Sequence, residues 1–291
     1  MPLISIIMPS YNAETTISRA IKSTLLALPA DGELVIVDDG SRDSSLEIAQ
    51  VAQSKDSRVR IIERPINGGI VAALNDGIVR SDSEFVGRMD ADDISLPWRL
   101  RYTLKALIHH RIDIAFTTVA SIGPGRSVRP AIPVGITPEA MGLNLLLVNP
   151  VAHSTMVATR KCLTALDGYR SVPSEDYDLW LRAASKGFRL ARLPLPSQLY
   201  RLHADQITAS AAWKEQASVN AKTAAAHQVL CEVLLGETIC AFTELRTGQI
   251  NSPEVGALLN AVTRAGRTLP ELEKLALNRQ LRKVTKQSHR V

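Results

Sequence analysis

Carboxylates cluster at one point of the chain. The stretch VGRMDADDISLPWRL, residues 86–100, places Asp90, Asp92 and Asp93 within four positions after a short apolar run. Paired carboxylates at a strand end suit Mg²⁺ or Mn²⁺, which prefer oxygen ligands and accept phosphates as further partners. Such a cation can neutralise a departing diphosphate. The alternative is an acidic turn in which Asp93 or Ser95 caps the next helix. An EF-hand calcium site is excluded, because its 12-residue ligand pattern is absent.

A second acidic pair, Asp38 and Asp39, ends the apolar run in ELVIVDDGS. Aspartate at a strand end is often a helix cap, but its carboxylate can also accept hydrogen bonds from a nucleobase or a ribose hydroxyl. Tyr11 follows the first apolar run and offers a ring that could cover a base. No G-x-G-x-x-G motif follows that run and no Walker A sequence occurs, so neither a Rossmann nor a P-loop site is indicated.

A third group begins a helix-like pattern in SEDYDLW. Glu175 and Asp176 lie where the helix dipole stabilises carboxylates, so simple capping is one interpretation. The other is catalytic: such a carboxylate could accept a proton from an attacking hydroxyl. Tyr177 and Trp180, close by in sequence, could then offer a sugar ring a flat surface.

The fourth group is YRLH, residues 200–203. Arg201 could pair with phosphate oxygens, because its planar guanidinium matches their geometry. His203 could complete a metal shell. Both residues are more often structural near a strand end, and that alternative stays open on the residues alone.

The elements that must position these residues alternate in type. Strands are predicted at 3–8, 33–38, 58–63 and 84–89, and helices at 13–28, 41–52 and 69–79. Strands alternating with helices predict a mostly parallel α/β sheet covered by helices on both faces. Ligands of such sheets collect at the carboxyl ends of the strands, where the acidic pairs fall.

The second half of the chain is less regular. Pro97 and Arg99 begin a helix that extends to about residue 110 and fixes the acidic turn from behind. Further elements are predicted as a strand at 112–119, a Gly/Pro-rich loop at 123–138, a strand at 152–160, a helix at 174–187 and a strand at 188–194. The Ala-rich remainder has only helical patterns, which predicts a main domain at 1–210 and a helical C-terminal extension at 211–291.

In this order the motifs resemble family 2 glycosyltransferases with the GT-A fold, of the type that builds bacterial polysaccharides. The matching stretches are ISIIMPSYNAETTISRAIKSTL, ELVIVDDGSRDSS, NGGIVAALNDGI, FVGRMDADDISLPWRL, NPVAHSTM, GYRSVPSEDYDLWLRAASKGF and LYRLHADQIT. They cover about residues 3–208. The resemblance implies a GT-A α/β sheet and an enzyme that transfers a sugar from a nucleotide-sugar donor.

The resemblance also implies roles for individual residues. Those that would bind the donor are Pro9, Tyr11, Asp38, Asp39, Asn67, Asp90 and Arg201. Those that would hold a Mn²⁺ or Mg²⁺ cofactor are Asp90, Asp92 and His203. Asp176 would be the general base, and Asp93, Glu175 and Trp180 would lie at the acceptor, although Asp93 could instead support the turn. The implied reaction inverts the anomeric centre, with a UDP-sugar as donor and a glycan or lipid-linked hydroxyl as acceptor in cell-surface polysaccharide biosynthesis.

Two other functions compete with this one. A sugar-phosphate nucleotidyltransferase usually has a Gly-rich basic loop after its first strand, where this chain has PSYNAETT. A non-catalytic nucleotide-sugar-binding protein would be expected to have lost the acidic motifs, which are present. Long hydrophobic helices and a QxxRW motif are missing, which favours a non-processive enzyme.

Composition limits the partners and the location. The 291 residues are 45% hydrophobic, and no apolar run is long enough to span a membrane. A cytoplasmic protein is predicted, because the three cysteines are scattered and the N-terminus lacks a signal-peptide pattern. Aromatic content of 4% without basic–aromatic interleaving argues against nucleic-acid binding. Six Lys/Arg against two Glu at 271–291 could hold the chain at the inner face of the cell membrane, or simply form a solvated helix face. The extension could also form a homodimer.

Overall fold

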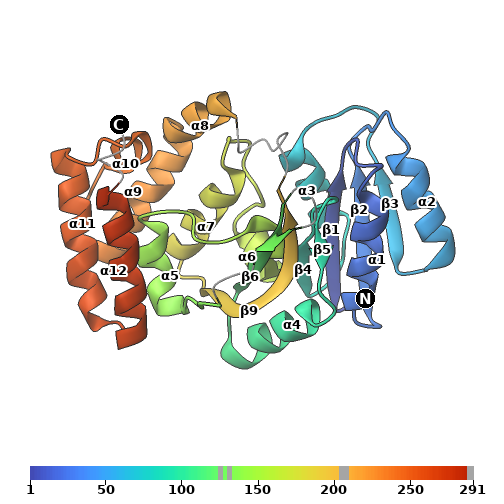
Figure 1. The fold of residues 1–291 in the computed structure, drawn as a ribbon, viewed down its shortest axis with the longest axis horizontal. Coiled ribbons are helices and arrows are strands. Elements are labelled where there is room, and N and C mark those ends of the chain that lie inside the picture. Colours follow the sequence, from blue (N-terminus) through green and yellow to red (C-terminus); the bar gives the residue numbers. More distant parts are fainter. Residues whose placement is uncertain (124–126, 130–132, 203–209, 287–291) are drawn as a thin grey trace. The chain divides into compact units, whose positions relative to one another are not determined.

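The computed structural model describes residues 1–123, 127–129, 133–202 and 210–286. The chain divides into two compact units (Figure 1). The first unit comprises Met1–Gly135, Val151–Tyr169 and Arg192–His203, and the second comprises Ile136–Pro150, Arg170–Ala191 and Ala204–Val291. Most of the predicted donor and metal residues belong to the first unit, whereas Asp176 belongs to the second.

The sheet has the order β3-β2-β1-β4-β8-β6-β9-β5, with β7 paired to β6. Its strands are β1 (Ile4–Ser10), β2 (Gly32–Asp38), β3 (Val59–Glu63), β4 (Phe85–Arg88), β5 (Ile94–Ser95), β6 (Ile114–Ile122), β7 (Val128–Arg129), β8 (Val157–Thr159) and β9 (Leu190–Arg201). The first four strands pair in parallel, as predicted, and β8 joins β4 antiparallel. The carboxyl ends of β1, β2 and β4 therefore meet at one edge.

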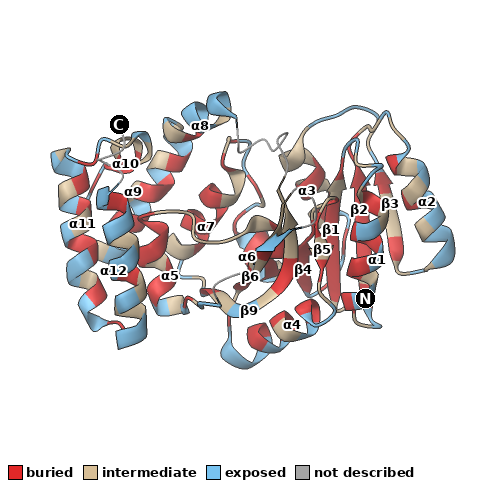
Figure 2. Cartoon of the chain, viewed as in Figure 1, coloured by how far each residue is buried: buried red, intermediate tan, exposed pale blue. Residues whose placement is uncertain are grey.

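Helices cover the sheet of the first unit. They are α1 (Ile17–Ala27), α2 (Ser45–Lys55), α3 (Ile70–Val79), α4 (Arg99–His110) and α6 (Arg160–Ala165), with a 3-10 turn η2 (His153–Thr155) before β8. Of these, α1, α2 and α3 lie on the parallel strands, and α4 and α6 lie on β6 and β8. The strand side chains between them are buried on both faces (Figure 2). Gly77 lets α3 lie directly on β1, because a Cβ there would come within 2.4 Å of the Ile7 side chain.

The second unit is helical. It contains α5 (Pro138–Leu145), α7 (Glu175–Ser185), α8 (Ala211–Ser218), α9 (Ala221–Leu235), α10 (Phe242–Thr247), α11 (Pro253–Ala265), η4 (Gly266–Thr268) and α12 (Glu271–Lys286). Because α9 packs on α5 and α7, the C-terminal helices share a core with segments from the middle of the chain. The domain boundary at residue 210 stays a prediction. No helix within the described ranges is both long and apolar enough to cross a membrane.

A buried histidine makes the second unit sensitive to acid. His227 is fully buried and its Nε2–H donates to the Leu146 carbonyl at 2.9 Å. Burial lowers the pKa of His227, and Arg246 acts in the same direction. In the unfolded chain the pKa of this histidine is about 6.5, so at lower pH the unfolded chain binds a proton that the folded chain does not. The free energy of unfolding therefore decreases as the pH is lowered below about 6.5.

We therefore expect the denaturation midpoint of the wild type to fall more between pH 7 and pH 5 than that of His227→Gln. The glutamine can still donate to Leu146 but cannot titrate. Thermal melts of both proteins across this range test the difference. Parallel pH profiles would contradict the role of His227.

Candidate active site

The loops that follow β1 and β2 are joined by hydrogen bonds. The Asn12 amide donates to Ser41 Oγ at 3.1 Å, and Asn12 Oδ1 accepts from the Arg42 amide at 2.9 Å. Beside them, Pro9 is partly exposed and Tyr11 is 48% exposed. This edge of the sheet thus presents an accessible aromatic ring on a loop that is fixed at its base.

Asp38 and Asp39 are both nearly buried, at 3% and 4% exposure. Asp38 Oδ2 accepts a hydrogen bond from the Ser41 amide at 3.0 Å, which closes the turn after β2. The other carboxylate oxygen of Asp38, Oδ1, is buried and has no hydrogen-bond partner among the described residues. Asp38 thus closes the turn at the strand end and retains one unused acceptor, and its contact with a donor stays a prediction.

Asp39 holds the loop that precedes α3. Its two oxygens accept from the amides of Gly68 and Gly69 at 3.0 and 2.8 Å, and Arg64 Nη1 lies 3.0 Å from Oδ1. Asn67, in the same loop, is exposed and accepts from the Gly69 amide at 3.1 Å. The structure therefore gives Asp39 a role in shaping the loop that presents Asn67, and its contact with a nucleobase stays a prediction.

The acidic turn after β4 brings three carboxylates together. Asp90, Asp92 and Asp93 each offer an oxygen within 4.8 Å of the others. Asp90 and Asp92 are partly exposed, and Arg88 Nη2 lies 2.7 Å from Asp90 Oδ1. Oxygen donors at this spacing fit a hard divalent cation with room for phosphate oxygens.

Asp93 differs from its two neighbours because it is 1% exposed. Its carboxylate accepts from Ser154 Oγ at 3.0 Å, Gln198 Nε2 at 2.6 Å and the Arg201 amide at 2.9 Å. Burial, with the charges of Asp90 and Asp92, raises the pKa of Asp93 to about 7. These contacts are those of a residue that supports the turn, and its carboxylate has no exposed face for an acceptor in this structure.

The end of β9 lies against the same turn. Arg201 Nε donates to the Asp92 carbonyl at 2.9 Å, so the predicted phosphate ligand is next to the acidic cluster. Tyr200 also faces the cluster: burial and the charges of the three aspartates raise its pKa to about 12. Sequence reasoning took only the arginine and histidine from YRLH and missed this tyrosine. His203 lies outside the described residues.

Arg99 supports the acidic turn from behind, as predicted. The side chain is fully buried at the start of α4, and its Nη2 donates to the carbonyls of Arg88 and Ser154. Burial lowers the pKa of Arg99 to about 10, while Asp90 and Asp93 oppose that shift. The guanidinium therefore stays charged at neutral pH and stabilises the backbone on both sides of the turn.

Replacing Arg99 by Ala is expected to destabilise the protein by about 3–5 kcal/mol. The change removes the Arg99 donor from two buried carbonyls and takes away one of the positive charges beside the acidic cluster. Chemical denaturation measures the loss. Arg101→Ala is the matched control, because Arg101 is exposed on the same helix and should change stability by only about 0.5 kcal/mol. Equal effects of the two substitutions would contradict the supporting role.

Asp176 lies in the second unit at the first turn of α7. Its Oδ1 accepts from the Tyr177 amide at 2.7 Å, and its Oδ2 accepts from Asn149 Nδ2 at 2.8 Å. Asp176 and the adjacent Glu175 are both partly exposed. The two donors fix the orientation of a carboxylate that solvent can reach. Asn149 was not singled out from the sequence, although it stands in the NPVAHSTM stretch.

The predicted sugar-stacking surface beside Asp176 requires a correction. Trp180 is 0% exposed and Tyr177 is 2% exposed. Tyr177 points inward and its hydroxyl donates to the Leu145 carbonyl. Both rings belong to the core of the second unit, so neither has a face open to a sugar in this structure.

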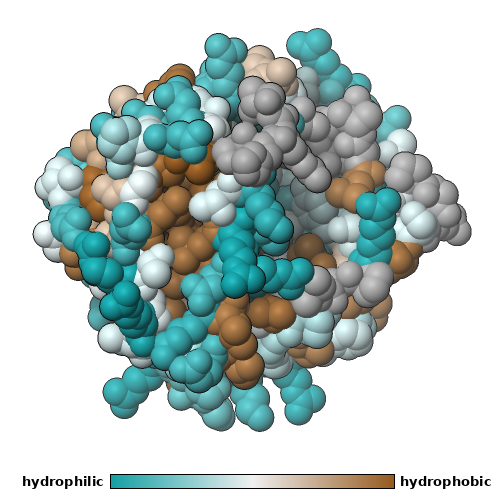
Figure 3. Space-filling view, turned by 60° about the vertical axis from the view of Figure 1, so that its left-hand side comes forward, coloured by the Kyte–Doolittle hydropathy of each residue, from teal (hydrophilic) through white to brown (hydrophobic). Residues whose placement is uncertain are grey.

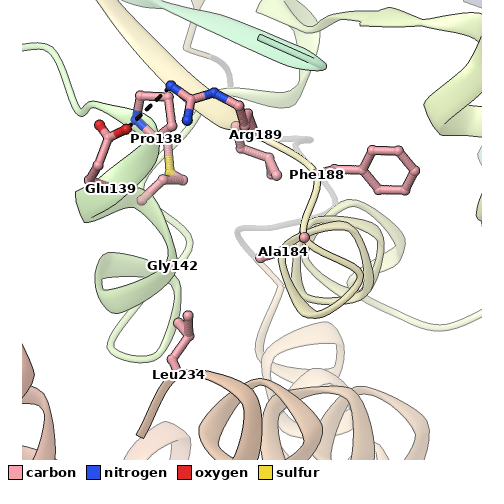
Figure 4. A pocket seen from close by; sticks show the side chains of 10 residues that line it. Pro138, Glu139, Gly142, Ala184, Phe188, Arg189 and Leu234 are labelled. Atoms are coloured by element: carbon pink, nitrogen blue, oxygen red, sulfur yellow. Dashed lines mark hydrogen bonds and ion pairs between the residues drawn. The ribbon is translucent and has the colours of Figure 1, made fainter. Parts of the chain in front are cut away.

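A separate pocket of about 220 Å³ lies within the second unit (Figure 4). Its walls come from α5, the end of α7 and Leu234 of α9, and Glu139 and Arg189 form an ion pair of 3.2 Å beside it. None of the predicted donor, metal or acceptor residues is among the described residues that line it. The pocket is therefore distinct from the candidate site.

A sheet with acidic residues at the carboxyl ends of its parallel strands is the arrangement expected of a GT-A transferase. Residues 5–162 match the family model described as Glycosyl transferase family 2. The chain belongs to this family and is a glycosyltransferase. The likeness to EpsE of Bacillus subtilis, provisionally named a glycosyltransferase, is 32% identity over 70% of this chain and 74% of that protein.

Other comparisons support the same family and fold. Escherichia coli WfgD, named a UDP-Glc:alpha-D-GlcNAc-diphosphoundecaprenol beta-1,3-glucosyltransferase, is 31% identical over 62% of this chain and 68% of its own. Staphylococcus aureus TarS 1–349, solved with UDP-GlcNAc, superposes with a TM-score of 0.64 at 21% identity, covering 99% of this chain and 88% of TarS. The mannosyltransferase PcManGT of Pyrobaculum calidifontis, solved with GDP-Man and Mn²⁺, gives 0.58 at 18% identity, with 99% and 87% covered.

Proposed function

We propose that the protein is a metal-dependent inverting glycosyltransferase of polysaccharide biosynthesis. It would transfer a sugar from a nucleotide-sugar, with UDP as the expected nucleotide, to a hydroxyl of a glycan or a lipid-linked acceptor. The observation that carries the proposal is the acidic turn, in which Asp90, Asp92 and Asp93 offer oxygens within 4.8 Å of one another at the end of a parallel strand.

The acidic turn divides into two accessible ligands and one support. Asp90 and Asp92 would hold Mn²⁺ or Mg²⁺, and the bound cation would stabilise the charge of the leaving diphosphate. Asp93 keeps the turn against β9 through Gln198 and the Arg201 amide. Arg201, next to the turn, would add a guanidinium to the diphosphate oxygens.

The donor nucleotide would bind at the ends of β1 and β2. Tyr11 would cover the base, and the loop that Asp39 fixes would present Asn67 to the nucleotide. The UDP-GlcNAc complex of TarS and the name of WfgD support a UDP-sugar, whereas the GDP-Man complex of PcManGT keeps a guanine nucleotide as the alternative. The diphosphoundecaprenol in the name of WfgD supports a lipid-linked acceptor.

Asp176 would act as the general base. Its carboxylate would accept the proton of the attacking hydroxyl, and the acceptor oxygen would attack the face opposite the diphosphate. One displacement inverts the anomeric centre, so an α-linked donor gives a β-linkage and no covalent enzyme intermediate is needed. This assignment leaves the charge stabilisation to the acidic turn and the proton transfer to α7.

A donor-hydrolysis panel tests the proposal. UDP-, GDP- and dTDP-sugars are incubated with the protein and Mn²⁺ or Mg²⁺, and the released nucleoside diphosphate is measured. We expect a clear preference for one donor and no release with EDTA. Binding of a donor without release would instead support the non-catalytic alternative. Formation of nucleoside triphosphate from a donor and added pyrophosphate would support the nucleotidyltransferase. Membership of the glycosyltransferase family argues against that last function.

A further inference from the structure

Large apolar residues reach the surface of the second unit at several places. Among the described residues of this unit, those that are more than one third exposed are Val219, Val229, Val233, Leu234, Leu272 and Leu275. On the face turned forward in Figure 3, hydrophobic atoms form a patch edged by hydrophilic ones. The exposed valines of α9 flank the exposed Glu232, whereas the leucines of α12 precede a series of cations. The two helices therefore offer different surfaces.

One face of α12 combines those leucines with four basic side chains. Leu272 and Leu275 are 82% and 63% exposed. The exposed cations that follow are Arg279, Arg282, Lys283 and Lys286. Steps of three and four residues place all six on one side of the helix, and the buried Leu277 and Val284 lie on the other. We call the six residues the α12 basic face.

No carboxylate neutralises this face within the described part of the chain. The acidic residues of α12 lie in its first turn, where Glu271 pairs with Lys274 at 2.7 Å and Glu273 accepts from the Thr137 amide at 3.1 Å. None of the four cations of the face forms an ion pair with another described residue. The face therefore carries four positive charges over about two turns beside two exposed leucines.

We propose that the α12 basic face docks the protein onto an anionic lipid bilayer. The positive charge of the face complements the negative charge of an anionic lipid surface, and each cation near such a surface strengthens binding about fivefold. The leucines favour a bilayer over a nucleic acid: they can insert among the acyl chains, whereas a phosphate backbone offers them no partner. The inference is independent of the donor chemistry proposed above, since it can be measured without turnover.

Flotation of the full chain with lipid vesicles tests the docking. We expect the wild type to float with vesicles of 30% phosphatidylglycerol in phosphatidylcholine and to bind much less to phosphatidylcholine alone. Raising the salt from 0.1 to 0.5 M should release most of the protein, because the charges are exposed. Failure of the wild type to float with anionic vesicles would overturn the proposal.

Variants locate the surface. Replacing the four cations by Gln is expected to weaken binding to anionic vesicles roughly 100-fold or more. The control variant replaces four exposed cations of the first unit, Arg19, Lys22, Arg101 and Lys105, and so has the same net charge but should bind as the wild type does. Leu272→Ala with Leu275→Ala should weaken binding to both vesicle types. Circular dichroism confirms that each variant is folded.

Two results would contradict the assignment of this face. Equal losses in the four-cation variant and its control would mean that net charge alone drives binding. Binding of duplex DNA or RNA that depends on the same four cations, without flotation, would make the face a nucleic-acid surface. In either case donor hydrolysis should remain intact, which separates this test from that of the proposed function.

Discussion

Asp92→Asn is expected to reduce release of nucleoside diphosphate from the preferred donor by at least about 10³-fold. The amide is nearly isosteric with the carboxylate, so the turn should keep its shape. It is neutral, however, and an amide is a weaker ligand for a hard cation than a carboxylate is. Asp92 is partly exposed within the acidic cluster, so its carboxylate is accessible to a cation and the substitution removes a candidate metal ligand.

Metal titration distinguishes this explanation from misfolding. The variant should need a much higher Mn²⁺ concentration for any residual activity, while its denaturation midpoint stays close to that of the wild type. Asp31→Asn is the matched control, because it removes one carboxylate from an exposed position just before β2. Full activity of Asp92→Asn at low Mn²⁺ would show that the acidic turn does not hold the metal.

The parallel half of the sheet could be predicted because its strands are buried on both faces. Such strands read as continuous β-branched runs, and β1, β2 and β3 pair in the predicted parallel sense. Their ends then locate the acidic pairs without further information. Local sequence therefore specified both the strands and the edge at which chemistry was expected.

Strand β9 shows what local sequence could not specify. The sequence predicts a strand that ends at residue 194, but one strand runs from Leu190 to Arg201. Pro194 and Pro196 normally mark the end of a strand, because they cannot donate to a ladder. Here the strand continues since its far end pairs with β5, at Leu199 opposite Ile94. That partner lies 105 positions away and has no local signal.

The same limitation applies to the site. Residue type predicted which carboxylates lie close together, but not which of them already accept hydrogen bonds from other groups of the protein. Asp39 is satisfied by Gly68 and Gly69, and Asp93 by Gln198 on β9. Trp180 was assigned to an acceptor because it is aromatic and close to Asp176, although it belongs to the buried side of α7. Burial of this kind is decided by tertiary packing.

Asp176→Asn is expected to lower donor hydrolysis by about 10²–10⁴-fold while leaving donor affinity almost unchanged. A general base contributes to the transition state through proton transfer, and an amide cannot accept that proton. Calorimetric titration with UDP and Mn²⁺ measures binding, and release of nucleoside diphosphate measures turnover. Glu215→Gln is the control, since it removes one carboxylate from an exposed position of α8 in the same unit and should retain most of the activity.

Asn149 gives a second test of the same base. It donates to Asp176 Oδ2 at 2.8 Å, so Asn149→Ala removes one of the two donors that orient the carboxylate and leaves the carboxylate itself in place. Turnover should then fall about tenfold with donor affinity unchanged, because orientation is lost but the base remains. If Asn149 acts on turnover through Asp176, combining Asn149→Ala with Asp176→Asn should cost no more than Asp176→Asn alone. Additive losses in the double variant would show that Asn149 acts independently of Asp176. Equal turnover in Asp176→Asn and the wild type would show that Asp176 is not the general base.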